Sequence, residues 1–188
     1  MVVETPSPPS DLVDAFVSTA HRIVWCTVAT VDRRGRPRSR VLHPYWERAG
    51  DGLTGWIVTR RSPLKSAHLQ RTPFVSCTYW DAAHDVAIAD CAAAWVQDGA
   101  ERARIWELFA AAPPPLGYDF RAVWPGGPDA PGSAALRLDP WRLQTADAMT
   151  VASPRAWRAP ARAAAQRHPG RANRNSPKPS VSRPPGAR

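Results

Sequence analysis

The chain has 188 residues, 44% of them hydrophobic and 22% charged, a composition that suits one packed domain. No stretch approaches the roughly 20 apolar residues of a membrane span, and the start of the chain lacks the pattern of a secretory signal. The net charge of +9 suggests nucleic-acid binding until it is located along the chain. All 16 acidic residues precede residue 150 and balance the basic residues there, so the excess positive charge lies wholly in 150–188. We expect a cytoplasmic protein.

The three cysteines, Cys26, Cys77 and Cys91, are widely spaced and form no CxxC pair. This spacing argues against a zinc site and against a disulfide framework. Each cysteine lies in an apolar run, so we expect buried thiols in a reducing compartment. The histidines also lack the spacing of metal ligands, and no metal site is expected.

The first predicted element is a short amphipathic helix with Ser10 as its N-cap and Asp11 in its first turn. A run of β-branched and aromatic residues at 23–32 predicts a strand. The turn around Gly35 then makes 36–46 the second strand of a hairpin.

Arginine occupies every second position at the start of that second strand, as Arg36, Arg38 and Arg40. Alternate residues of a strand share one face, so three repelling cations would lie side by side. Either the face is solvated or it binds an anion. Because the strand becomes apolar immediately after Arg40, a ligand with an anionic end and a flat apolar body would match it.

A second basic cluster follows the strand predicted at 53–59, in the sequence "TRRSPLK". Ser62 and Pro63 are typical of a helix N-terminus, where backbone N–H groups and the helix dipole attract phosphate. Lys65, in the first turn, adds a charge, and the helix is expected to end before Pro73.

The remaining residues predict two further strands, a helix that begins at Asp98, a long loop whose aromatic residues imply packing, and a bent last strand. These elements lie at 74–80, 86–96, 98–112, 113–132 and 133–147. The order predicts a mainly β protein with helices (α+β), a small antiparallel barrel of six to seven strands with two or three peripheral helices.

We expect this domain to span 1–149. The basic tail at 150–188 is rich in Arg, Pro and Ala and is expected to be disordered. Such an arm either binds nucleic acid or another acidic partner, or results from a GC-rich coding region read past its usual end.

Three segments together resemble one known family. The segments "GRPRSRVLHPYW", "GWIVTRRSPLKSAHL" and "PFVSCTYWD" are similar to the pyridoxamine 5'-phosphate oxidase-like flavoproteins, in element order over roughly 12–146. The spacing of five residues between Thr59 and Lys65 is among the sharpest matches, and later segments resemble a branch of actinobacterial type. The resemblance implies an FMN-binding split β-barrel, a homodimer with a flavin in each of two clefts between the subunits.

The resemblance also implies roles for individual residues. Arg40 and Lys65 would bind the FMN phosphate, and Val41 and Leu42 would line the isoalloxazine ring. Val58 and Thr59 would contact the ring and the phosphate. The implied activity is that of an oxidoreductase on an unidentified small molecule, and no catalytic residue is assigned because the cofactor carries the chemistry.

The chain departs from the family at Pro63-Leu64-Lys65, where pyridoxamine phosphate oxidases proper carry S-R-K. One phosphate-binding arginine is missing, and Ser62, Arg60, Arg61 or Arg38 would have to replace it. The pyridoxal phosphate-binding residues near the C-terminus also lack a clear match, which argues against vitamin B6 oxidation.

Two questions stay open at this point. Relatives of the fold also bind haem or a deazaflavin coenzyme, and the extra arginines would suit the longer anionic tail of the deazaflavin, which is the alternative to FMN. His43, beside the expected ring site, is either a proton donor or substrate contact, or a partly exposed histidine at a strand end.

Overall fold

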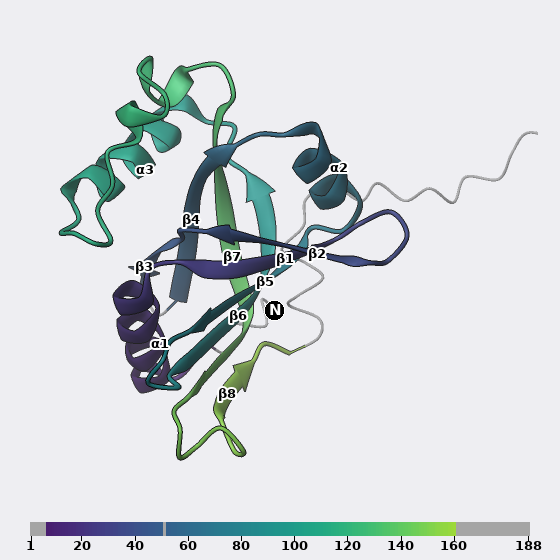
Figure 1. Cartoon of the computed structure of the whole chain (residues 1–188), viewed down its shortest axis with the longest axis vertical. Coiled ribbons are helices and arrows are strands. Elements are labelled where there is room, and N and C mark those ends of the chain that lie inside the picture. The colour runs from purple at the N-terminus through teal and green to yellow at the C-terminus, as the bar shows by residue number, and fades with distance from the viewer. Residues whose placement is uncertain (1–6, 51, 161–188) are drawn as a thin grey trace, which may run out of the picture.

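A computed structural model describes residues 7–50 and 52–160, which form one antiparallel sheet with three α-helices around it (Figure 1). The strands follow the order β2-β1-β5-β6-β7-β4-β3, with β8 paired to β7. Their bounds are β1 Cys26–Val31, β2 Pro37–Leu42, β3 Tyr45–Ala49, β4 Gly52–Arg60, β5 Phe74–Trp80, β6 Val86–Trp95, β7 Ser133–Ala146 and β8 Arg155–Arg158. The predicted mainly β class is confirmed, with eight strands in the described residues where six to seven were expected.

One of the extra strands arises because the strand predicted at 36–46 is two strands. β2 pairs with β1 and ends at Leu42, whereas β3 begins at Tyr45 and pairs with β4. These two strands lie at opposite ends of the strand order, so the chain passes from one edge of the sheet to the other between them. Pro44 lies at this crossing, and a proline cannot donate the hydrogen bond that would continue a ladder.

The three helices lie where the sequence predicts them. They are α1 Ser10–Ile23, α2 Pro63–Arg71 and α3 Gly99–Ala111. The expected caps of α2 and α3 are confirmed, because Ser62 accepts from the backbone N–H of Lys65 and Asp98 from that of Glu101. The expected cap of α1 is wrong: Ser10 is already helical, and Pro9 takes the N-cap position without a side-chain hydrogen bond.

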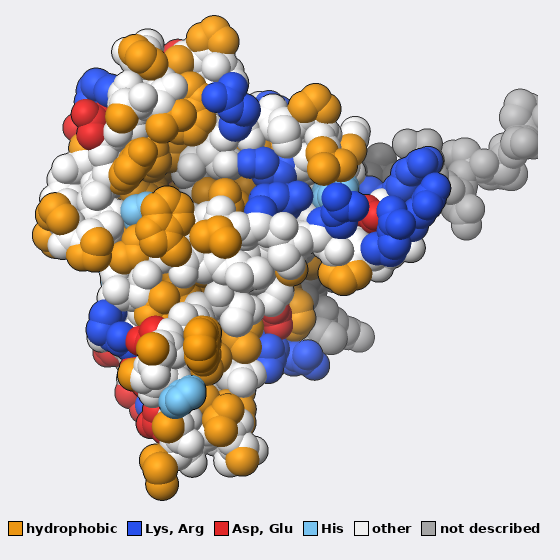
Figure 2. Space-filling view, in the orientation of Figure 1, with side chains coloured by type: hydrophobic (Ala, Val, Ile, Leu, Met, Phe, Trp, Pro, Cys, Tyr) orange, Lys and Arg blue, Asp and Glu red, His pale blue; other side chains and the backbone are white. Residues whose placement is uncertain are grey.

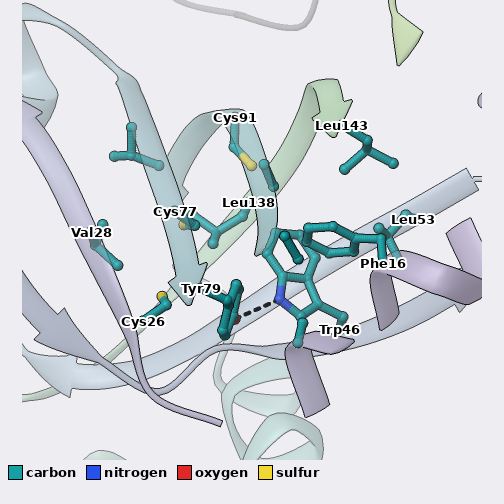
Figure 3. Close-up of a cluster of buried hydrophobic side chains, with 14 of the residues drawn as sticks. Phe16, Cys26, Val28, Trp46, Leu53, Cys77, Tyr79, Cys91, Leu138 and Leu143 are labelled. Carbon is teal, nitrogen blue, oxygen red and sulfur yellow. Dashed lines mark hydrogen bonds between the residues drawn. The ribbon is translucent and has the colours of Figure 1, made fainter. Parts of the chain in front are cut away.

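The main core lies between α1 and one face of the sheet (Figure 3). Phe16 of α1 packs edge-on against Trp46, with ring centroids 4.9 Å apart, and the Trp46 Nε1–H donates to Tyr79 Oη at 2.8 Å. Gly55 on β4 leaves room for the Trp46 ring, which would lie 2.6 Å from a Cβ atom there. The three cysteines belong to this core as free thiols, which confirms the expectation that they are buried.

A second core lies on the other face of β4, under α3 and the segment 113–132 (Figure 1). Trp56 and Val58 of β4 pack there against Trp106 and Phe109 of α3 and against Trp124 of the long segment. β4 is therefore buried on both faces, and the long loop packs on the domain as its aromatic residues predict.

The expected tail at 150–188 is not wholly separate from the domain. β8 pairs with β7 through Arg142↔Arg158 to Thr145↔Arg155, so the expectation of disorder is wrong for 155–158. Residues 161–188 lie outside the described residues, and so the rest of that expectation stays a prediction. Within the described part of the chain, no helix is long and apolar enough to cross a membrane.

Candidate anion-binding site

The site begins with Lys65, which the start of α2 holds inside the protein. Ser62 caps the helix by accepting from the Lys65 N–H at 3.3 Å, and Pro63 occupies the first turn. The Lys65 side chain is only 9% exposed, and its Nζ donates to Thr59 Oγ1 at the end of β4 at 2.6 Å. Burial of the ammonium group, and then the positive charge of Arg40, lower the pKa of Lys65 from 10.5 to about 8.

Arg40 reaches the same region from β2. Its Nη1 donates to the hydroxyl of Thr30 at 3.0 Å, and Thr30 is buried on the neighbouring strand β1. The Thr30 hydroxyl also lies 3.0 Å from Nδ1 of His68, which belongs to α2. Burial and the charge of Arg38 lower the pKa of the Arg40 guanidinium. The charge of Arg38 therefore lowers the pKa of Arg40, and the charge of Arg40 lowers the pKa of Lys65.

We call Arg38, Arg40 and Lys65 the cation cluster. Among residues 7–50 and 52–160, no carboxylate oxygen lies within 4.0 Å of any of their side-chain nitrogens. Figure 2 shows Lys and Arg side chains gathered along the β1–β2 hairpin and beside α2. Three neighbouring cations that repel one another, two of them partly or fully buried, are costly to hold together without a counter-charge, and an anionic group among them would offset that cost.

Two of the other basic candidates, Arg36 and Arg61, have partners elsewhere. Arg36 precedes β2 instead of lying on it, and its guanidinium pairs with Asp32 at 2.9 Å, so the row of three strand arginines is reduced to two. The guanidinium of Arg61 lies 5.2 Å above the ring of Trp95, and Arg60 lies beside Gly132. Of the four residues suggested as a replacement for the missing arginine, Arg38 is the cation that the structure couples to Arg40.

The apolar candidates divide between two faces of the sheet. Val41 is 64% exposed on the outer face of β2, whereas Leu42 is half-buried and packs against the main core. Thr59 lies on the side of β4 that Lys65 reaches, but the Val58 side chain is buried in the core under α3. Adjacent strand residues point to opposite faces, so only the backbone of Val58 remains for a ligand at this site.

His43 is buried, not partly exposed, and its ring lies 5.2 Å from that of Trp25 and 5.3 Å from that of Phe109. Burial lowers its pKa, while a hydrogen bond to the backbone of Leu116 opposes that shift. Nε2 of His43 is buried without a partner among the described residues. The ring thus links the end of β2 to α3 and the segment 113–132, with Nε2 left unpartnered among the described residues.

Sequence reasoning missed both Thr30 and His68 as residues of this site. Both belong to the site, because their contact joins β1 to α2 and orients Arg40. No local signal marks a threonine in a β-branched strand as such a residue; only the pairing of Thr30 with Arg38 across the hairpin does so. In the described residues, no group of three His, Cys, Asp or Glu side chains is placed to hold a metal ion.

Comparisons with solved structures show which fold this is. A protein related to general stress protein 26, from Clostridium acetobutylicum, has 14% identity and a TM-score of 0.62, over 78% of this chain and 93% of that one. General stress protein 26 from Bacillus anthracis has 15% identity and a TM-score of 0.59, over 78% and 98%. A pyridoxamine 5'-phosphate oxidase-related, FMN binding protein from Nostoc punctiforme has 14% identity and a TM-score of 0.54, over 81% and 90%.

These likenesses confirm the predicted split-barrel fold. No curated protein matches the chain. A family model described as pyridoxamine 5'-phosphate oxidase matches residues 12–147, which include β1 to β7 and the whole cation cluster. The chain therefore belongs to the pyridoxamine 5'-phosphate oxidase family.

Proposed function

We propose that the chain is an FMN-binding flavoprotein whose cation cluster holds the phosphate of the cofactor. The observation that carries the proposal is the convergence of Arg38, Arg40 and Lys65 with no carboxylate within 4.0 Å among the described residues. A phosphate dianion would supply the missing counter-charge. Family membership and the relative described as an FMN binding protein support the choice of a flavin.

The proposed binding mode uses the cation cluster for the phosphate and the end of β2 for the ring. The guanidinium groups of β2 and the Lys65 ammonium would donate to the phosphate oxygens, and the positive end of the α2 dipole would add to their attraction. Val41 follows Arg40 on β2 and would offer aliphatic contact to the ring from the outer face, whereas Leu42, which packs against the main core, would contribute through its backbone. The hydrogen bond of Arg40 to Thr30 fixes the guanidinium before the ligand arrives, which reduces the ordering cost of binding.

We further propose that the protein is an oxidoreductase acting on a small molecule. A bound flavin would supply the hydride-transfer chemistry, and the chain would hold the phosphate and shield the ring from water. Pro63 and Leu64 replace the residues that pyridoxamine phosphate oxidases proper carry, so the name of the family does not identify the substrate.

The proposed assembly is a homodimer. Val41 of β2 and Phe74 and Trp80 of β5 lie on the outer face of the sheet, because the register aligns Val41 with Thr27 and Thr27 with Thr78. They are 64%, 43% and 60% exposed, an apolar surface that is costly to leave in water. A second copy would cover this surface beside the expected ring site. A cytoplasmic location completes the proposal, because free buried thiols suit a reducing compartment.

The test is flavin binding by the purified protein and by matched variants. We expect the visible absorption of an oxidised flavin at one flavin per chain. Arg40→Ala and Lys65→Ala should each weaken FMN binding roughly tenfold or more, because each removes a charge-assisted hydrogen bond. Arg121→Ala, which removes an exposed cation outside the cluster, is the control. A colourless protein that takes up neither FMN nor a deazaflavin, or cluster variants that bind like the control, would overturn the proposal.

Two alternatives have their own readouts. A deazaflavin coenzyme would place a phosphate at the same cluster, and mass spectrometry of the copurifying small molecule distinguishes it from FMN. A nucleic-acid binder acting through the basic tail would lose that affinity on truncation after residue 160. Cutting there keeps β8 in the sheet, so flavin binding should survive if the tail is a separate module.

A further inference from the structure

A hollow of about 330 Å³ lies next to the cation cluster, between the β1–β2 turn and the outer side of α2. Leu64, Ala67 and His68 of α2 form one wall. The opposite wall is the hairpin turn and the start of β2, with the residues Asp32, Arg33, Arg34, Arg36 and Arg38. In Figure 2 this part of the surface, at the tip of the hairpin, is dominated by Lys and Arg side chains.

The single acid of the pocket is already occupied. Asp32 accepts from the backbone N–H groups of Arg34 and Arg36 at 2.8 and 3.0 Å and pairs with the Arg36 guanidinium. These bonds, the Arg36 N–H foremost, lower the pKa of Asp32 to about 2. Asp32 therefore builds the turn and neutralises Arg36. In the described ranges 7–50 and 52–160, no carboxylate oxygen lies within 4.0 Å of the side-chain nitrogens of Arg33, Arg34 or Arg38.

The pocket shares Arg38 and His68 with the site around the cation cluster. Arg38 lines the pocket and is also the cation whose charge acts on Arg40. His68 lines the pocket and contacts Thr30, which in turn accepts from Arg40. A ligand anchored by its phosphate at Arg40 and Lys65 would thus have a second positively charged space directly beyond Arg38.

We propose that this pocket is a second anion subsite, which takes a phosphate or carboxylate group through Arg33, Arg34 and Arg38. The inference rests on the proposed function, because it treats the cluster at Arg40 and Lys65 as the first phosphate site. The second anion belongs either to an extension of the molecule bound at the cluster or to a separate small polyanion. The apolar wall of Leu64 and Ala67 suits the part of a ligand that joins two anionic groups.

The variant Arg33→Ala/Arg34→Ala tests the pocket without disturbing the turn. Asp32 receives only the backbone N–H of Arg34, so neither substitution removes a bond that builds the hairpin. The control is Arg71→Ala/Arg121→Ala, which removes the same charge from exposed positions that do not line the pocket. The probe is inorganic pyrophosphate, titrated calorimetrically into FMN-loaded and flavin-free protein.

We expect pyrophosphate to bind the FMN-loaded protein, more weakly as salt rises, and to lose roughly fivefold to tenfold in affinity in the pocket variant alone. FMN affinity should not change in that variant. A wild-type preference for FAD over FMN that the pocket variant abolishes would assign the second anion to the cofactor itself. Pyrophosphate binding without that preference would assign it to a separate molecule.

Absence of pyrophosphate binding, or equal binding by the pocket and control variants, would overturn the inference. If the protein takes up no flavin, the proposed function fails but the subsite is still tested. In the flavin-free protein, Arg33→Ala/Arg34→Ala would then weaken pyrophosphate binding more than Lys65→Ala does.

Discussion

Replacing Lys65 with methionine should stabilise the flavin-free protein while it weakens flavin binding. In the folded protein the pKa of Lys65 is lowered from 10.5 to about 8, because burial desolvates the ammonium group and Arg40 repels it. At about 1.36 kcal/mol per pKa unit, holding the charge there costs about 3 kcal/mol near pH 7. Removing the hydrogen bond to Thr59 leaves a buried hydroxyl unpaired and costs about 1–2 kcal/mol. The variant should therefore be more stable by about 1–2 kcal/mol.

The contribution of Lys65 to stability also depends on pH in a definite direction. The folded pKa of Lys65 lies below the unfolded value, so between pH 8 and 10.5 the unfolded chain holds a proton that the folded chain has released. Lys65 therefore makes wild-type stability rise with pH through this window. The methionine variant lacks this contribution, so its advantage over wild type should shrink as the pH rises. Other groups that ionise in this range act on both proteins and cancel in the difference.

The assay is urea unfolding of both proteins, freed of flavin, at several pH values from about 7 to 10. The matched control is Thr59→Val, which removes the hydrogen-bond acceptor but keeps the ammonium, and which should be less stable than wild type. A methionine variant that is clearly less stable than wild type near pH 7 would show that the Lys65 charge is not held at a cost. So would a stability difference that does not change with pH, since Lys65 would then not be a destabilised cation.

Three further outcomes follow from the same structure. FMN affinity should fall as the pH rises above about 8, because a neutral Lys65 no longer attracts the phosphate; titrations across this range should show a loss that the methionine variant lacks. Trp80→Glu should yield monomers in sedimentation, whereas the control Met149→Glu, which alters an exposed side chain off the sheet, should leave a dimer; a dimeric Trp80 variant would place the interface elsewhere. Gly55→Ala should destabilise the fold by about 1–3 kcal/mol in urea unfolding, because its Cβ would lie 2.6 Å from the Trp46 ring; an unchanged midpoint would contradict this packing.

Much of the local structure could be predicted because its causes lie within a few residues. Ser62 and Pro63 indicate where α2 begins, and Gly35, with φ of 77°, allows the turn between β1 and β2. The wrong N-cap prediction for α1 also has a local cause, because Ser10 and its neighbours are nearly equivalent positions at which a helix can begin. Lys65 could be marked as a phosphate candidate, because its position in a first turn is itself a local property.

What joins the site together is not local. The sequence shows two basic clusters on separate elements, and only the folded sheet brings Arg40 and Lys65 close enough for one charge to lower the pKa of the other. Thr30 and His68, which link these elements, carry no sequence signal because each is needed only once β1 lies under α2.

The division of the strand 36–46 has a similar reason. Its alternating arginines would fit one long strand equally well. The chain forms two strands because β3 pairs with β4, at the far end of the strand order from β2. Propensity and spacing thus determined which segments are strands and helices and which residues carry charge. Tertiary pairing decided which charges meet, because long-range contacts bring the elements together and exclude the water that would otherwise screen those charges.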